Sequence, residues 1–136
     1  MSRGLRNNNP GNIRLSAMRY RGEVVPSADI AFKQFETMAW GYRAIFMLLD
    51  TYRVKHGLTT LRGMIGRYAP PCENDTGRYL AFVAYRSGVD PDVVLDTRAR
   101  EQMVSVVGAM SRMENGVEPI ADDVEAGWEL FVKYRS

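Results

Sequence analysis

The run TMAWGYRAIFMLLDTYRVKHG, residues 37–57, decides the fold class of this chain of 136 residues. Its apolar side chains recur at helical spacing. The main series is Trp40, Ala44, Leu48 and Tyr52. Thr37 can cap the amino end of a helix, and Gly57 accepts the left-handed conformation that ends one. The run therefore predicts a long helix over about residues 37–55 with an apolar face toward a core.

Further helices are expected after Gly57, because capping and turn residues bracket apolar residues at helical spacing. One helix would begin at Thr59 or Thr60 and stop before Pro70 and Pro71, and the next would begin at Asn74 or Asp75 and stop at Gly88. Asp90 and Pro91 predict a short turn. Two more helices would begin at Asp96 and Asp122, the first of them ending at Asn115 and Gly116.

The chain before Thr37 shows short strands and turns instead. Alternating residues predict strands over residues 12–15, 19–22 and 30–35, and Asn7, Asn8, Asn9, Pro10 and Gly11 predict a dense turn. At this length one domain is expected. The sequence thus predicts a mainly α (α+β) single domain over residues 1–136, with strands and turns in 1–36 and helices in 37–136. It would have five or six helices and a small N-terminal β-hairpin.

Composition excludes several classes of protein. Hydrophobic residues make up 46% of the chain and there is one cysteine, so we expect stability from packing and not from an internal disulfide. The longest strongly apolar run, residues 44–49, is too short to cross a bilayer. The first residues lack the apolar stretch of a secretory signal, so we expect synthesis in the cytoplasm without membrane insertion.

Charge is unevenly distributed. Residues 1–72 hold eleven basic side chains against four acidic ones, whereas residues 73–136 hold seven against twelve. An anionic partner for the front half is one interpretation, with nucleic acid, a phosphate or cell-wall peptide carboxylates as candidates. The alternative is that the arginines only solvate a face of the protein.

Metal and nucleophile sites are not expected. One histidine, His56, and one cysteine, Cys72, cannot supply a tetrahedral zinc site. The glycines do not fall in a phosphate-binding spacing, and there is no GxSxG motif. His56 fits a helix end and Cys72 a small packed residue. We therefore predict no metal and no cofactor.

Carboxylates near aromatic residues remain as candidates for catalysis. Glu73 lies in a rigid loop with Tyr68 and Tyr79 close on either side. In an aromatic cleft, desolvation would raise the pKa of Glu73 and suit it as a general acid. The alternative is that Glu73 or Asp75 only caps the following helix. Glu36, beside the Thr37 cap, is a second candidate; Glu23, after the predicted hairpin turn, is a weaker third.

Three blocks of sequence resemble a known family. They are RGLRNNNPGNIR at residues 3–14, FKQFETMAWGYRA at 32–44 and RYAPPCENDTGRY at 67–79. Together they resemble a family of phage and prophage proteins that often carry the label virion structural protein. The likeness spans roughly residues 3–90.

The first two blocks also resemble bacterial cell-wall glucosaminidases and lytic transglycosylases of the lysozyme-like superfamily. The lytic endopeptidase of double-stranded RNA phages is a further relative in kind. This resemblance implies a lysozyme-like domain and peptidoglycan as substrate. Residues 8, 9 and 12–14 would match the family's Asn-rich turn and strand, and Phe32, Phe35 and Thr37 its approach to the helix.

The resemblance also implies the site residues. In those enzymes the catalytic Glu ends a helix upstream of the Asn-rich turn, and none of the six residues before Asn7 is acidic. Glu73 or Glu36 would take the catalytic role. The expected substrate-binding residues are Asn8, Asn9, Asn12, Arg14, Tyr68, Asp75, Thr76 and Tyr79.

The leading hypothesis is a phage-derived muralytic enzyme that cleaves the glycan strand by general acid catalysis from Glu73. The rival is a non-catalytic virion structural or peptidoglycan-binding protein of the same fold. Nucleic-acid binding ranks last, because no helix rich in Arg and Lys is evident. Expected partners are peptidoglycan and other virion proteins, and expected locations after cytoplasmic synthesis are the virion, the periplasm or the cell wall.

Overall fold

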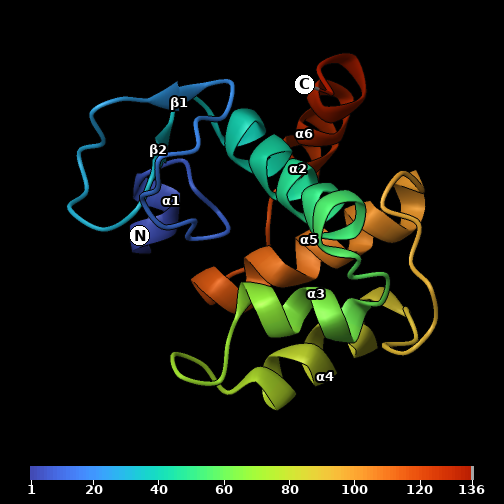
Figure 1. Ribbon diagram of the computed structural model, residues 1–136. Helices are drawn as coiled ribbons and strands as arrows, with labels where there is room; N and C mark the ends of the chain where they lie inside the picture. The colour runs from blue at the N-terminus through green and yellow to red at the C-terminus, as the bar shows by residue number, and fades with distance from the viewer. Residues whose placement is uncertain (136) are drawn as a thin grey trace.

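The computed structural model describes residues 1–135, which form six helices and one small sheet (Figure 1). The elements are α1 (Arg3–Arg6), β1 (Glu23–Val24), β2 (Gln34–Phe35), α2 (Met38–His56), α3 (Leu61–Tyr68), α4 (Thr76–Ser87), α5 (Arg100–Asn115) and α6 (Ala121–Lys133). The mainly α prediction with a small hairpin near the amino end is therefore confirmed.

Helix α2 is the centre of the fold. The Thr37 hydroxyl accepts a hydrogen bond from the backbone N–H of Trp40, and Gly57 ends the helix at φ 65°, so both predicted caps are confirmed. Burial extends almost around the middle of the helix, from Gly41 to Phe46, and is not confined to one face. This is expected of a helix that has neighbours on several sides.

Helix α6 crosses behind α2 in Figure 1 and packs closely against it. Gly127 permits the approach, because a Cβ added there would lie 2.5 Å from the Cβ of Tyr42. Phe46 then meets Trp128 edge-on, with ring centroids 5.1 Å apart, and stacks on Phe131 at 6.0 Å. These rings form the densest part of the core.

Helices α3, α4 and α5 pack together beside α2 (Figure 1). Thr60 and Asp75 cap α3 and α4 with their side chains, as expected from the sequence. The predicted start of α5 at Asp96 is wrong: that carboxylate accepts from the N–H of Arg98 in a turn, and the helix begins at Arg100 without a side-chain cap. Asp122 likewise lies within the first turn of α6 and does not cap it.

The front segment, residues 1–37, has less regular structure than its alternating residues suggest. Its strands are two residues each and antiparallel, with Glu23 opposite Phe35 and Val24 opposite Gln34. Arg14 and Phe32 form one further isolated bridge. The predicted strand over residues 19–22 is absent: residues 21 and 22 form a turn, and β1 begins just after them. Backbone hydrogen bonds outside the two strands and side-chain hydrogen bonds to backbone carbonyls hold the rest of this segment.

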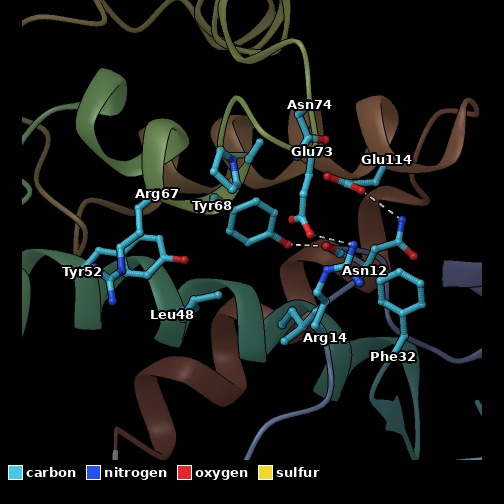
Figure 2. Close-up of a pocket in the computed structure, with 14 residues that line it drawn as sticks. Asn12, Arg14, Phe32, Leu48, Tyr52, Arg67, Tyr68, Glu73, Asn74 and Glu114 are labelled. Atoms are coloured by element: carbon cyan, nitrogen blue, oxygen red, sulfur yellow. Dashed lines mark hydrogen bonds and ion pairs between the residues drawn. The ribbon is translucent and has the colours of Figure 1, made fainter. Parts of the chain in front are cut away.

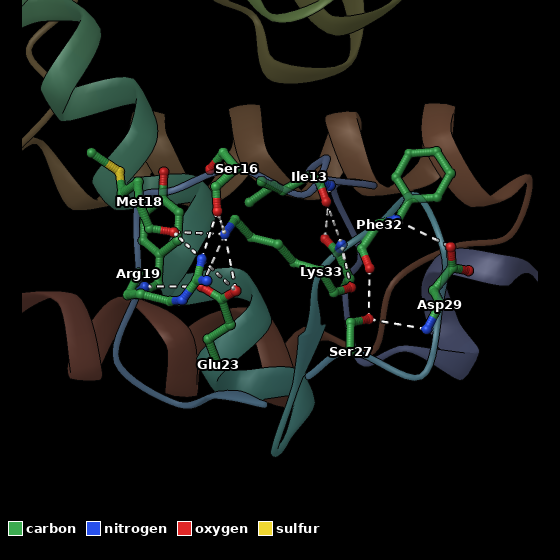
Figure 3. A network of polar contacts seen from close by, with 11 residues as sticks. Ile13, Ser16, Met18, Arg19, Glu23, Ser27, Asp29, Phe32 and Lys33 are labelled. Carbon is green, nitrogen blue, oxygen red and sulfur yellow. Dashed lines mark hydrogen bonds and ion pairs between the residues drawn. The ribbon is translucent and has the colours of Figure 1, made fainter. Parts of the chain in front are cut away.

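Lys33 is the main organiser of the front segment (Figure 3). Its side chain is 0% exposed, and its Nζ donates to the Met18 carbonyl at 2.7 Å and to the Glu23 carboxylate at 2.9 Å. Glu23 is itself only 3% exposed. Because this carboxylate is buried in an ion pair, Glu23 has a structural role here.

Candidate functional site

A cavity of about 390 Å³ opens where the front segment meets α2, α3 and α5 (Figure 2). Its walls come from residues 11–14, Phe32, helix α2, the end of α3 with the loop that follows, and Glu114 on α5. Figure 2 shows Tyr52 and Arg67 at one end, and Phe32 and Glu114 at the other. The pocket therefore joins parts of the chain that are far apart in sequence.

The Asn-rich turn builds the front wall. Asn8 and Asn12 both have φ 50°, a conformation that Asn tolerates better than most residues. Asn9 is fully buried, and its amide donates to the carbonyls of Ile13 and Lys33 at 3.0 and 2.9 Å. The dense turn is thus confirmed. Asn9 itself is excluded from touching a ligand, because it has no exposed surface.

Tyr68 ties α3 to this turn. Its hydroxyl donates a hydrogen bond to the Gly11 carbonyl, which is visible in Figure 2. A Cβ at position 11 would lie 2.2 Å from that hydroxyl, so the contact requires glycine. Burial, with the nearby charge of Glu114 as a smaller cause, raises the pKa of Tyr68 well above its usual value. The hydroxyl therefore remains a donor at any physiological pH.

Glu114 is the most perturbed carboxyl that faces the pocket. Its Oε1 accepts from the Asn12 amide at 3.0 Å, and its Oε2 accepts from the Tyr79 hydroxyl at 2.8 Å. Desolvation raises the pKa of Glu114, and these two hydrogen bonds offset only part of that rise. A carboxyl in this state retains its proton to a higher pH than an exposed one, which is what a general acid needs.

Glu114 is absent from the site residues predicted from the sequence, although the sequence contains a signal for it. Met103, Val107 and Met110 lie on the buried face of α5, and the next position at helical spacing is residue 114. A carboxylate that continues the buried apolar face of a helix either has a polar partner or has a shifted pKa. This position lies outside the three resemblance blocks, so neither the motifs nor the resemblance pointed to it.

Glu73 lines the same pocket, but its predicted burial is wrong. The side chain is 46% exposed, and its carboxylate forms an ion pair with Arg14 at 3.3 Å. The loop after α3 turns tightly at the surface, with the N–H groups of Glu73 and Asn74 both donating to the Pro70 carbonyl. This turn holds Glu73 at the rim, from where it points toward Arg14 in Figure 2.

The structure brings together some of the expected site residues and not others. Those that line the pocket are Asn12, Arg14, Tyr68 and Glu73. Those that do not are Asn8, Asn9, Glu36, Asp75, Thr76 and Tyr79. Asp75 caps α4, and the Thr76 hydroxyl donates to the Ala69 carbonyl. Tyr79 is buried, so its ring cannot stack on a sugar, but its hydroxyl reaches the pocket through Glu114.

Arginines and rings complete the walls. The Arg14 guanidinium lies 5.2 Å from the centre of the Phe32 ring, and that of Arg67 lies 5.4 Å from the Tyr52 ring. The first pair offers a cation beside a partly exposed ring, whereas the Tyr52 ring is buried and leaves Arg67 as the group that faces the pocket. Such a lining suits a ligand that carries both carboxylates and rings or sugar faces.

Two features are missing from residues 1–135. No group of three or more His, Cys, Asp or Glu side chains is placed to hold a metal ion. No helix combines the length and the apolar character needed to cross a bilayer.

Comparison with known proteins finds a phage relative. No family model matches the chain. Over 132 residues it is 40% identical to Protein P5 of Pseudoalteromonas phage PM2, a match that covers 94% of this chain and 81% of that protein. A match of that extent includes α5 and the position of Glu114, well beyond the likeness seen in the sequence, which ends near residue 90.

Proposed function

The chain belongs to the family of phage protein P5, and we propose that it cleaves the glycan strands of peptidoglycan with Glu114 as the general acid. The observation that carries the proposal is the Glu114 carboxyl itself, which is desolvated, held by Asn12 and Tyr79, and presented to an open pocket.

In this proposal Glu114 donates its proton to the glycosidic oxygen while the bond from that oxygen to the sugar carbon breaks. A water molecule then supplies the hydroxyl group to the carbon, and the proton of that water passes to the Glu73 carboxylate. Two carboxyl groups in one pocket, one that favours the protonated form and one at the exposed rim, suit this division of roles.

Peptidoglycan fits the remaining walls. Its strands present sugar faces, and its stem peptides present carboxylates. Phe32, which is partly exposed, offers an aromatic surface, and Arg14 and Arg67 offer the cations that bind carboxylates. The resemblance to lysozyme-like wall-cleaving enzymes supports the same substrate and a single lysozyme-like domain over residues 1–136. We accordingly propose association with the virion and its other proteins, and action at the cell wall.

Digestion of purified sacculi tests this function. Wild-type protein should release soluble muropeptides, and Glu114→Gln should lower the rate by at least about a hundredfold, the usual effect of losing a general acid. Glu36→Gln is the matched control, because Glu36 is exposed and does not line the pocket. Intact sacculi after incubation with folded wild-type protein would contradict the proposal.

A second candidate function is binding without cleavage, and one observation favours it. Both oxygens of Glu114 already accept hydrogen bonds, from Asn12 and from Tyr79, so the group also joins α5 to α4 and the front segment. A purely structural Glu114 would leave a module that retains peptidoglycan. Co-sedimentation of the protein with sacculi that releases no soluble product would select this function over the first.

A further inference from the structure

Arg67 is the cation of the Glu114 pocket that has no acidic partner among residues 1–135. The charged side chains among the described residues that line this pocket are Arg14, Arg67, Glu73 and Glu114. Arg14 is already paired with Glu73 at 3.3 Å. The Arg67 guanidinium lies 5.4 Å from the centre of the Tyr52 ring and forms no ion pair or side-chain hydrogen bond within the described chain. The positive charge of the pocket is therefore concentrated at Arg67.

A role at the end of a helix does not account for where the Arg67 side chain lies. Arg67 is in the last turn of α3, where a cation interacts favourably with the helix dipole. That interaction requires only a charge near the helix end. The Arg67 side chain instead lines the pocket and lies over a buried ring, and the Tyr68 hydroxyl anchors the end of α3 to the Gly11 carbonyl. The guanidinium is thus held at the pocket wall while Arg67 stays exposed to solvent.

Arg67 and Glu114 lie at opposite ends of the pocket, with Leu48 and Tyr68 between them in Figure 2. A substrate whose glycosidic oxygen meets Glu114 would present a different part of itself to Arg67. Arg67 is therefore placed to select substrates by a group that lies away from the cleaved bond.

A carboxylate is the group that suits Arg67. A guanidinium group binds a carboxylate through two parallel hydrogen bonds, and no described residue accepts from the side-chain N–H groups of Arg67. In peptidoglycan the stem peptides carry carboxylates, whereas the sugar rings are uncharged. Building on the proposed cleavage at Glu114, we infer that Arg67 binds a stem-peptide carboxylate and makes the protein selective for glycan strands that carry peptides.

Digestion of two soluble substrates tests this selectivity. One is uncross-linked peptidoglycan, and the other is the same strands after an amidase has removed their stem peptides. The wild-type kcat/KM should be about tenfold higher or more on the peptide-bearing strands, as a charge-assisted hydrogen-bonded pair implies. Arg67→Gln should bring the ratio of the two values close to one, and Arg67→Lys, which keeps the charge, should restore part of it.

Arg78→Gln is the matched control, because Arg78 is exposed on α4 and does not line the pocket. Its ratio should equal that of the wild type. Peptide-bearing strands whose carboxylates have been converted to methyl esters should be cleaved like the bare strands. A wild-type ratio near one, a ratio that Arg67→Gln leaves unchanged, or an equal decrease in Arg78→Gln would overturn the role of Arg67.

Binding measured without cleavage separates the role of Arg67 from the proposed function. The Glu114→Gln variant is titrated calorimetrically with a disaccharide tetrapeptide and with the same disaccharide lacking its peptide. The peptide-bearing fragment should bind about tenfold more tightly, and adding Arg67→Gln should remove this preference. If the preference is present but the wild type cleaves neither strand, the cleavage proposal is wrong and the carboxylate site stands. Equal affinity for the two fragments would overturn the site, whether or not the wild type cleaves.

Discussion

In the front segment, residues 1–37, the buried side chains are Pro10, Ile13 and Phe35 together with the polar Asn7, Asn9 and Lys33. In α2–α6 the buried side chains are mostly apolar, with the Phe46, Trp128 and Phe131 rings in mutual contact. One region is held by polar groups that satisfy one another, and the other by apolar packing. The Glu114 pocket lies at the boundary between them.

This difference explains where the carboxyl with the raised pKa lies. A polar segment that docks on an apolar helical surface brings Asn12 against α5, and it covers a carboxyl that would otherwise face water. Asn115 reinforces the boundary by donating to the Pro10 carbonyl at 2.8 Å. The perturbed carboxyl is thus a product of the contact between the two regions.

The largest effect is expected in the apolar region. Phe46→Ala should lower the free energy of unfolding by about 3–5 kcal/mol, because a fully buried ring that contacts two others leaves a cavity. Denaturant unfolding measures the loss. Val132→Ala on the exposed side of α6 should change stability by less than about 0.5 kcal/mol. Equal effects of the two changes would mean that packing is not what holds this region.

A slightly smaller loss of unfolding free energy is expected from a substitution in the polar front segment. Lys33→Met removes the nearer ion-pair partner of the buried Glu23 carboxylate and leaves it Arg19 at 3.9 Å, which should cost about 3 kcal/mol. Adding Glu23→Gln should restore much of the stability, because the remaining charge is removed and the glutamine oxygen can still accept from the N–H of Tyr20. Arg62→Met breaks the exposed pair with Asp92 and should cost less than about 1 kcal/mol. A double variant no more stable than Lys33→Met would refute the ion-pair explanation.

The structure of the helical region can be predicted from the sequence more fully than that of the front segment. The long helix, the Thr60 and Asp75 caps and the glycine stops could be predicted, since apolar spacing and capping chemistry are local. The Lys33–Glu23 pair could not, because nothing in a strand-like alternation says that a lysine faces inward. Within the site, the Asn-rich turn was predictable, but Glu114 depends on partners 102 and 35 residues away in sequence.

Ionised carboxylates should have opposite effects on stability at different places in the molecule. In the front segment, the Arg3 guanidinium and the N–H of Ala31 hold the pKa of Asp29 well below its usual range. The resulting stabilisation is full above the unfolded-state pKa, about 4, and is lost as pH falls through the lowered folded value. Asp29→Asn should therefore lower Tm at pH 7 and have progressively less effect below pH 4. A loss of Tm that stays constant with pH would argue against this ion pair.

The smallest change in Tm is expected for Glu114, at the boundary between the front segment and the helices. Its sign should be opposite to that for Asp29. Because the pKa of Glu114 is raised in the folded state, its ionisation disfavours folding at neutral pH, and this cost disappears below the unfolded-state value. Glu114→Gln should raise Tm slightly at pH 7 and leave it unchanged near pH 3, while the sacculus digestion is lost. Thermal unfolding at the two pH values checks this. A variant less stable than wild type at pH 7 would favour the structural role of Glu114.

The most direct test follows the Glu114 side-chain carboxyl carbon by NMR through a pH titration of the folded wild-type protein. Desolvation at the boundary between the two regions should give Glu114 a pKa above that of an ordinary glutamate, and Asn12→Ala should alter it. A titration at or below the ordinary glutamate value would mean that the pocket does not shield this carboxyl, and the proposed proton donor would be lost with it.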